Sequence, residues 1–368
     1  MSNIFDYMNW RDIDIKKVEF NEIDNLILAR VSYFPLDGLI KEAGAKLKEA
    51  YINLKNKENL NIYLQKEDKD FFKILAQSTR FGDLIMSNYE NHIDKEKEKQ
   101  FAAVTILLPY DVLYVSFRGT DNTIVGWKED FNMSFQDLVP SQIEAVTYLE
   151  KIAEKYPKRQ IIVGGHSKGG NLAVYAAAFC NSKCKNRIID VYNNDGPGFQ
   201  ENVIKSIEYK EILNKIHTYR PQTSIIGKLL NHEEKYITLK STETGIMQHD
   251  LYSWQVLGDK FIRTESTNAS DVIDKTITEW LKEVKPEQRE KFIDILFEIL
   301  NKTDADTLHE MKDNWLNSSM TILKGYKDIN EQDKEIISKS LTALVSAAKG
   351  NIKINPPKGL KFRRKKDL

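Results

Sequence analysis

One short run of this sequence has the residue types and the spacing of a serine nucleophile. Ser167 stands between Gly165 and Gly169, after an apolar run at 160–164 and before an amphipathic stretch at 169–180. A strand that turns directly into a helix brings its two arms so close that the residues two before and two after the serine must be nearly free of side chain. The helix start also points free N–H groups and the positive end of its dipole at the serine. The run therefore predicts a nucleophile elbow with a strained serine, rather than an ordinary tight turn.

A serine hydroxyl is a weak nucleophile until a base removes its proton, and histidine is the usual base. In folds that carry such an elbow the chain order is serine, acid, histidine, which disfavours His92 and His309. His166 is the neighbour of the serine but lies on the other side of the turn, where we expect it to pack beneath the sheet. The remaining candidates are His217, His232 and His249.

We choose His249 as the base. It lies 82 residues beyond Ser167 in the loop-like run 245–250, after the apolar run 236–239 that predicts a late strand. The alternative is that His249 is a buried structural histidine.

A second run resembles a segment of a known enzyme family. Residues 117–120, with the sequence Phe-Arg-Gly-Thr, are followed by Trp127 and Asp130. This segment is similar to the Phe-Arg-Gly-Ser/Thr and Trp-x-x-Asp segment of the class 3 lipases, which are α/β-hydrolases. From about residue 20 to 260 the chain more closely resembles an uncharacterised bacterial family of lipase-like hydrolases related to that class. We expect Trp127 and Asp130 to brace the loop rather than to contact substrate. The other motifs of the resemblance are residues 164–177, 193–199, 224–230 and 248–254.

The resemblance implies Ser167 as the nucleophile, His249 as the base, and Thr120 and Lys168 as the residues whose backbone N–H groups form the oxyanion hole. General chemistry agrees with that assignment. The N–H after the nucleophile points into the same space as the serine oxygen, and a second donor from the loop after an earlier strand can bracket a developing oxyanion.

The triad acid is where the sequence departs from the class 3 lipases. Those enzymes supply an aspartate from an Asp-x-Val-Pro-like loop, and the corresponding residues 220–227 contain no carboxylate. Asp195 is our candidate because it follows the apolar run 188–194, at the carboxyl end of a predicted strand, where parallel-sheet sites lie. Two alternatives stay open. Asp195 can be a turn or cap residue, and Ser224 or a backbone carbonyl can orient the imidazole instead.

Lys168 also departs from the family pattern, because the residue after the lipase serine is usually apolar. We expect its side chain to be solvated at the helix start. The alternatives are a preference for substrates with an anionic group, or an ion pair with a carboxylate such as Asp195.

The elements around these residues predict an α/β fold. Short apolar runs rich in β-branched residues alternate with helical stretches, which favours a mainly parallel sheet covered on both faces. Before them, residues 24–31 predict a buried element, and two charged stretches with helical periodicity look like packing rather than chemistry. The expected strands are 102–108, 112–117, 160–164 and 187–193, and the expected helices are 39–56, 66–80, 141–155 and 169–180.

After residue 268 the strand signals vanish and helical periodicity takes over. The stretch predicts four helices that pack on the hydrolase part or partly cover its site, at 270–284, 286–302, 306–326 and 331–348. The last eighteen residues carry seven Lys or Arg and one acid, and we expect a solvated, disordered tail. An alternative is weak contact of this tail with an anionic membrane surface or with nucleic acid. The predicted division is a hydrolase domain at 1–265, a helical region at 266–350 and the tail at 351–368.

Composition restricts the class of protein. Of 368 residues 41% are hydrophobic, and 54 basic residues balance 54 acidic ones, so no overall field recruits nucleic acid. Cys180 and Cys184 have no second Cys/His pair that would complete a zinc site, and we expect buried or half-buried thiols. The N-terminal residues lack the pattern of a secretory signal, and no apolar run has membrane-spanning length. We expect a cytoplasmic protein.

Two functions of different classes fit these observations. The first is hydrolysis of a carboxylic ester, lipid or small molecule, through an acyl-enzyme, which needs no metal or cofactor. The second is a hydrolase-like scaffold that binds a lipid or a protein without turnover, which the missing lipase aspartate favours. Oligomeric state has no signal in the sequence.

Overall fold

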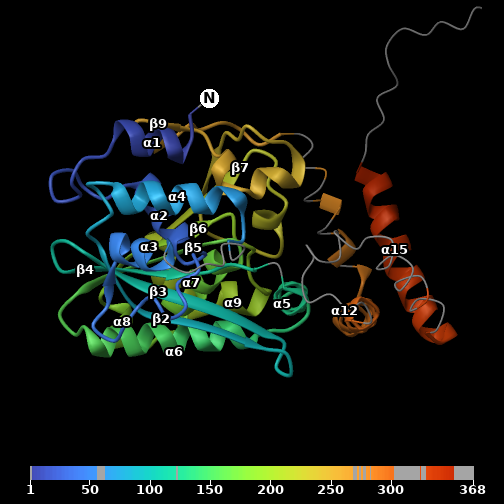
Figure 1. Ribbon diagram of the computed structural model, residues 1–368. Helices are drawn as coiled ribbons and strands as arrows, with labels where there is room; N and C mark the ends of the chain where they lie inside the picture. The colour runs from blue at the N-terminus through green and yellow to red at the C-terminus, as the bar shows by residue number, and fades with distance from the viewer. Residues whose placement is uncertain are drawn as a thin grey trace, which may run out of the picture.

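An eight-stranded sheet forms the centre of the molecule (Figure 1). The computed structural model describes residues 2–55, 63–121, 123–267, 272, 275–276, 279–281, 283–301, 324 and 329–351. The strands lie side by side in the order in which they occur in the sequence. They are β1 (Ala45–Lys46), β2 (Ile85–Asp94), β3 (Lys99–Leu108), β4 (Val112–Phe117), β5 (Gln160–His166), β6 (Ile188–Asn194), β7 (Ile216–Pro221) and β8 (Tyr236–Leu239).

The direction of pairing changes at β4. Strands β1 to β4 pair antiparallel, and β4 to β8 pair parallel. Parallel neighbours need long crossovers, and between β4 and β7 these are supplied by α6 (Pro140–Lys155), α7 (Lys168–Phe179) and α10 (Ile207–Ile212). The predicted fold class, an α/β-hydrolase fold with a mainly parallel sheet and a C-terminal helical part, is confirmed.

The sheet is covered on both faces, which explains its apolar strands. On β4, Tyr114 belongs to one hydrophobic core, whereas Leu113 and Val115 belong to the other. Residues 161–163 of β5 are all buried, as expected for a strand with a helical layer on each side. Cys180 and Cys184 lie in the second core as buried free thiols, as predicted.

The two cores have different helical covers (Figure 1). Above the sheet lie α1 (Ile4–Trp10), α2 (Glu22–Val31), α3 (Leu47–Lys55) and α4 (Lys66–Gln77), and below it lie α6, α7, α8 (Ser182–Lys185), α9 (Glu201–Lys205) and α10. The remaining short elements are the 3-10 turns η1 (Leu213–Lys215), η2 (Ile226–Lys228), η3 (Gly245–His249) and η4 (Leu251–Ser253), and a separate hairpin of β9 (Val256–Leu257) and β10 (Lys260–Phe261).

The N-terminal part differs from the prediction in two places. The helix expected from residue 39 begins only at Leu47, because residues 45–46 pair as β1. Strand β2 was not predicted, since its sequence is largely polar and half of it pairs beyond an irregularity between Ser87 and Glu90.

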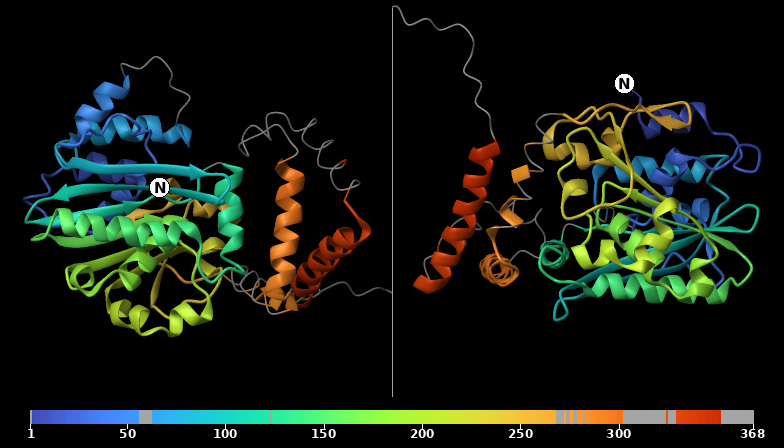
Figure 2. Two further views of the ribbon diagram at one scale, coloured as in Figure 1. Left: turned by 90° about the horizontal axis from the view of Figure 1, so that it is seen from below. Right: turned by 180° about the vertical axis from the view of Figure 1, so that it is seen from behind.

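The C-terminal helices lie beside α5 (Ile124–Asn132), away from the two main layers (Figure 2). Helix α12 (Pro286–Asn301) packs on α5, and α15 (Glu331–Asn351) packs on α12. These two helices agree with the predicted 286–302 and 331–348. The helix expected at 306–326 falls outside the described residues except for 324, and only part of 270–284 is described. The tail, beyond residue 351, is also outside them, and the division at 265 stays a prediction.

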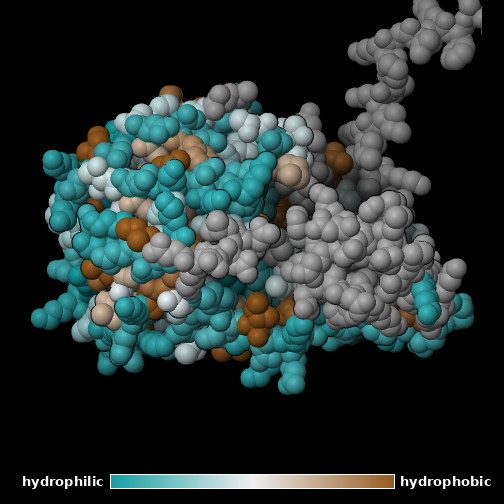
Figure 3. Space-filling view, in the orientation of Figure 1, coloured by the Kyte–Doolittle hydropathy of each residue, from teal (hydrophilic) through white to brown (hydrophobic). Residues whose placement is uncertain are grey.

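The surface of the α/β part shows no broad apolar field in the view of Figure 3, where isolated hydrophobic residues lie among hydrophilic ones. Single exposed hydrophobic side chains of this kind are normal on folded proteins. Among the described helices, none has both the length and the apolar character needed to cross a membrane.

Candidate active site

Ser167 lies in a strained turn between β5 and α7. Its φ of +58° and ψ of −134° put a residue with a side chain in the left-handed region, as the predicted elbow requires. A Cβ atom at Gly165 would come 2.3 Å from the backbone of Gly169, and one at Gly169 would come 2.2 Å from the carbonyl oxygen of Phe117. The two glycines are therefore needed because strand, helix and the neighbouring strand approach each other at backbone distance.

His249 lies at the end of η3 and contacts a carboxylate. Its Nδ1 is 2.7 Å from Oδ2 of Asp195, a residue with no exposed surface that directly follows β6 at φ +53°. Because Nδ1–H donates to that carboxylate, Nε2 of a neutral His249 keeps its lone pair for accepting a proton. The sequence left open that His249 is a buried structural histidine and that Asp195 is a turn or cap residue. Neither alternative explains why the two side chains pair.

Ser224 supports Asp195 rather than replacing it. Its hydroxyl donates to Oδ1 of Asp195 and accepts the N–H of Gly227 at 3.0 Å. The carboxylate therefore has one oxygen on His249 and the other on Ser224. The alternative in which Ser224 itself orients the imidazole is wrong, because Asp195 is the group in contact with Nδ1.

The loop after β4 reaches the serine through Gly119. A Cβ atom there would lie 3.0 Å from Cβ of Ser167. The N–H of Gly119 donates to the hydroxyl of Tyr33 at 3.0 Å, and that hydroxyl donates to the carbonyl oxygen of His166 at 3.1 Å. The side chain of Tyr33, from the turn that follows α2, therefore joins the loop to the elbow. The sequence assigned no role to Tyr33, so this contact is a finding of the structure.

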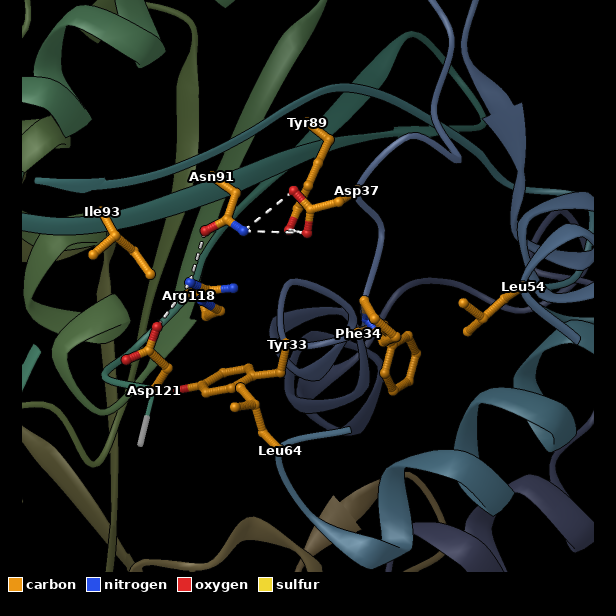
Figure 4. A pocket seen from close by; sticks show the side chains of 11 residues that line it. Tyr33, Phe34, Asp37, Leu54, Leu64, Tyr89, Asn91, Ile93, Arg118 and Asp121 are labelled. Carbon is orange, nitrogen blue, oxygen red and sulfur yellow. Dashed lines mark hydrogen bonds and ion pairs between the residues drawn. The ribbon is translucent and has the colours of Figure 1, made fainter. Parts of the chain in front are cut away.

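Arg118 fixes the same loop from its other side, in a second cavity of about 450 Å³ (Figure 4). Its guanidinium donates to Asn91 at 2.9 Å and to Asp121 at 3.2 Å, and Asn91 in turn donates to Asp37 at 3.2 Å. The sequence did not predict this role, since Asn91 lies on the unpredicted β2. Tyr33 lines this cavity as well as the one that contains Ser167.

Lys168 contradicts its predicted environment. Its side chain has no exposed surface, and Nζ donates to Glu129 at 2.8 Å and to the carbonyl of Gln100 at 2.9 Å. The solvated side chain and the pair with Asp195 are both wrong, because Glu129 of α5 takes the charge. Asp195 is consequently left to His249. A buried and paired ammonium is also a poor ligand for an anionic substrate, which removes the third expectation.

Helix α5 brings one face to the serine. Thr123 caps its first turn by accepting the N–H of Gly126 at 3.1 Å. Trp127, Asp130 and Phe131, at positions i, i+3 and i+4, share a face and all line the cavity of Ser167. The hydroxyl of Thr120 donates to Asp130, so Asp130 braces the loop as expected. Trp127 differs from the expectation in that it forms part of the cavity wall.

Burial raises the pKa of Asp130 to about 6, although the nearby Lys168 and the hydrogen bond from Thr120 both lower it. This carboxyl therefore changes its charge within a few units of neutral pH. Since Asp130 contacts Thr120, its charge acts directly on the loop beside Ser167.

His166 is buried, but it does not simply pack beneath the sheet. Its ring lies against that of His249 with centroids 4.6 Å apart, and Nε2–H donates to the carbonyl oxygen of His249 at 2.8 Å. Burial, followed by the charge of His249, lowers the pKa of His166 well below its ordinary value. His166 is therefore a neutral ring that helps to fix the backbone of His249.

The other histidines lie away from Ser167. His217 is 2.7 Å from Asp190, His232 is 2.9 Å from Glu234, and His92 contacts Glu144. None of these three lines the cavity that contains Ser167. His309 is outside the described residues.

The cavity that contains Ser167 has a volume of about 340 Å³ and a mainly apolar wall. Thr120 and Lys168, whose N–H groups are the predicted oxyanion donors, line it together with Ser167 and His249. Sequence reasoning missed Arg30 of α2, Tyr33 after it and Gln65 before α4, and Trp280 and Leu281 from the helical region. Besides these and the three residues of α5, the wall contains Met133, Ser134, His166, Pro197, Ile226, Leu229 and Leu230.

The site combines a strained serine after a parallel strand with an aspartate at the carboxyl end of the next strand, paired with a histidine from a later turn. Together with helices on both faces of the sheet, these features define an α/β-hydrolase-fold protein. A family model described as Mbeg1-like matches residues 75–298, and the chain belongs to that family. A comparison with curated proteins found no match.

Similar solved structures include three fungal lipases. Lipase II from Rhizopus niveus is 14% identical over 65% of this chain and 93% of its own, with a TM-score of 0.40. The lipase from Rhizopus microsporus var. chinensis is 12% identical over 65% of this chain and 86% of its own, also with a TM-score of 0.40. The Rhizomucor miehei lipase propeptide complex is 14% identical over 49% and 70%, with a TM-score of 0.36.

Proposed function

We propose that this protein is a serine hydrolase that cleaves carboxylic esters through an acyl-enzyme intermediate. The observation that carries the proposal is the contact of 2.7 Å between Nδ1 of His249 and Asp195. His249 also lines the cavity that contains the strained Ser167. Triads are recognised by geometry and roles rather than by sequence motifs, so an acid in an unusual position is compatible with the activity.

In the proposed reaction His249 Nε2 takes the proton of the Ser167 hydroxyl while the serine oxygen attacks the ester carbonyl. The tetrahedral intermediate collapses, the ester C–O bond breaks, and His249 gives its proton to the leaving alcohol. Water then repeats the attack on the acyl-serine and releases the carboxylic acid. Asp195 holds Nδ1–H throughout and stabilises the imidazolium.

The oxyanion of the intermediate is proposed to accept hydrogen bonds from the backbone N–H groups of Thr120 and Lys168. Their position is supported by the close approach of Gly119 to Ser167 and by the position of Lys168 at the first turn of α7. One donor of this kind is worth about 10²–10³ in rate.

The competing proposal is a scaffold that binds a lipid or a protein without turnover. Its sequence argument was the missing lipase aspartate, and Asp195 beside His249 weakens that argument. The strain at Ser167 also favours catalysis, because a side chain in this backbone region costs about 1–3 kcal/mol and has little structural use.

The substrate class is proposed from the cavity. Its mainly apolar wall supports an ester with a hydrocarbon part, from a lipid or a small molecule, and the chemistry requires no metal or cofactor. A cytoplasmic location stays a proposal that the two free, buried thiols support. The bacterial source implied by the resemblance and a membrane contact through the tail also stay proposals.

The test is labelling of the purified protein with a fluorophosphonate probe. We expect wild-type labelling and none in Ser167→Ala, with labelling slowed by about 10³-fold or more in His249→Ala. His217→Ala is the matched control, because it removes a histidine with its own aspartate outside the cavity. A folded wild type that never labels, or a label that persists in Ser167→Ala, rules out the proposed hydrolase.

A further inference from the structure

Two kinds of side chain line the cavity of Ser167. Polar residues such as Ser167, His249 and Asp130 adjoin an apolar wall, which includes Trp127 and Phe131 of α5 and Ile226, Leu229 and Leu230. The helical region adds Trp280 and Leu281 to this apolar wall. A segment more than 100 residues beyond the elbow therefore contacts the same space as the serine.

Trp280 is held in place by the other helices of its region. Its indole Nε1–H donates to the carbonyl oxygen of Ser340 on α15 at 3.0 Å, and its ring meets Phe292 of α12 edge to face. Because the only polar atom of the side chain is already paired with α15, the surface that it offers to the cavity is apolar.

Helix α12 is in turn fixed to α5, the helix that carries the rest of the wall. Phe131 and Phe297 place their ring centroids 5.9 Å apart, and Nζ of Lys128 is 3.0 Å from Asp294. The guanidinium of Arg289 donates to the carbonyl oxygen of Ser134. Three contacts of different chemistry thus connect α12 to α5 and the residues after it, and Figure 2 shows the two helices side by side.

Arg30 and Lys168, two cationic side chains that line the cavity, are already paired with carboxylates, and Lys168 contacts Glu129. Arg30, the cationic side chain of α2 that borders the cavity, makes two hydrogen bonds to Asp68 at 2.6 and 2.7 Å. A mainly apolar wall whose cations are already paired favours a hydrocarbon and disfavours an anionic group, which would lose its hydration there without gaining a partner. The volume of about 340 Å³ is at the low end for small-molecule sites, and it suits one chain better than several.

We propose that Trp280 is a specificity-determining residue, and that the helical region forms the binding site for a single hydrocarbon chain of the ester. The inference rests on the proposed hydrolase function and names the substrate part that its cavity selects. The chain can belong to the acyl group or to the alcohol, and the experiment separates the two.

The experiment measures chain-length selectivity in the full-length protein. For the acyl side, kcat/KM is measured with p-nitrophenyl acetate and p-nitrophenyl octanoate. For the alcohol side, it is measured with ethyl acetate and octyl acetate by acid release. In Trp280→Ala we expect the octanoate-to-acetate ratio, or the octyl-to-ethyl ratio, to fall at least about 10-fold.

Two further variants separate binding from folding. Trp280→Phe keeps an apolar ring and should retain most of the selectivity. Phe131→Ala changes the same wall from α5 and should lower the same ratio, so the proposal is testable even if Trp280→Ala does not fold. Trp10→Ala is the matched control, since Trp10 is an exposed tryptophan on α1, and it should keep both ratios.

A binding measurement separates the proposed chain-binding site from the hydrolase function on which it rests. In Ser167→Ala, the uncharged methyl ester of dansyl-undecanoic acid should bind about 10-fold more weakly when Trp280→Ala is added. If the wild type neither labels nor hydrolyses, the hydrolase proposal fails, and this loss of affinity still supports the chain site. If the wild type hydrolyses esters while folded Trp280→Ala and Phe131→Ala keep both ratios and the probe affinity, the chain site is wrong and the hydrolase stands.

Discussion

Two aspartates in and just after strand β6 each pair with a histidine at the same contact distance, but the two pairs have different surroundings. Asp190, within the strand, is 2.7 Å from Nε2 of His217, and Asp195, just beyond its end, is 2.7 Å from Nδ1 of His249. The side chains of the first pair are 41% and 36% exposed, whereas the carboxylate of the second has no exposure. Only the second pair meets the cavity of a strained serine.

The comparison shows that hydrogen-bond length does not identify a catalytic dyad. A buried carboxylate keeps its partner in one orientation, and its field is not weakened by water, so it can hold an imidazolium as the charge develops. The exposed pair is partly screened and is worth little. The position at the carboxyl end of a parallel strand is what brings one aspartate, and not the other, to the elbow.

The largest expected effect is on Asp195. Asp195→Asn should lower kcat/KM for an ester by about 10⁴-fold, because the amide favours the wrong imidazole tautomer and cannot stabilise the imidazolium. Asp190→Asn is the matched control and should stay within about 2-fold of wild type, since its histidine is outside the cavity. Comparable losses in the two folded variants would contradict the distinction between the pairs.

A second comparison concerns buried and exposed lysines. Lys168→Met should lower the free energy of unfolding by about 3–5 kcal/mol, because it leaves Glu129 charged and buried without its partner. Lys151→Met breaks an exposed pair with Glu90 and should cost about 0–1 kcal/mol. Urea unfolding of both variants measures the difference, and equal costs would mean that burial of the Lys168 pair does not matter.

The next effect tests what holds Asp195. Ser224→Ala removes a hydrogen bond to the carboxylate and should lower kcat/KM by about 10-fold. The loss should be far smaller than that of Asp195→Asn, since the pair with His249 persists. If Ser224→Ala matched Asp195→Asn in steady-state kinetics, Ser224 would be the primary orienting group after all.

The smallest effect is a pH dependence of stability. Asp130 has its pKa raised to about 6, so the folded state keeps a proton that the unfolded state has lost between about pH 4 and 6. The protonated Asp130 carboxyl therefore makes its full contribution to the stability of the wild type at pH 4, and this contribution is lost as the pH rises through 6. The Tm of Asp130→Asn, relative to wild type, should rise by about 2–4 °C over that range.

The control for this trend is Asp83→Asn. Lys48 and Lys46 lower the pKa of the Asp83 carboxyl to about 2, so its contribution is lost only as the pH falls below about 4. Its Tm difference from wild type should stay level between pH 4 and 7. A level difference for Asp130→Asn as well would show that this carboxyl titrates normally.

The sequence predicted the parts of the site that local sterics and strand position determine. The elbow at Ser167 follows from two glycines and an apolar strand, and Asp195 was a candidate because it follows β6. The burial of Lys168 was not predictable in this way, because its partner Glu129 lies 39 residues earlier and only the fold brings the two together.

The N-terminal and C-terminal contributions were missed for a related reason. Tyr33 follows a predicted buried element, and Trp280 stands in a predicted helix. Local patterns of this kind show which residues are buried but not what they contact. Strand β2 was missed because strand propensity reflects packing of apolar and β-branched side chains, and its residues from Asn88 to His92 are mostly polar. Long-range contacts of this kind have no local signal in a single sequence.

The distance along the chain between Ser167 and His249 has a consequence during synthesis. A ribosome adds about 5–20 residues per second, so the nascent chain carries the serine for roughly 4–16 s before its histidine is made. The Tyr33, Gly119 and His166 contacts can already form in that interval, because all three residues precede Ser167. Part of the elbow's support therefore precedes the proposed base, and the 82-residue interval delays the proposed acyl transfer until most of the sheet has been synthesised.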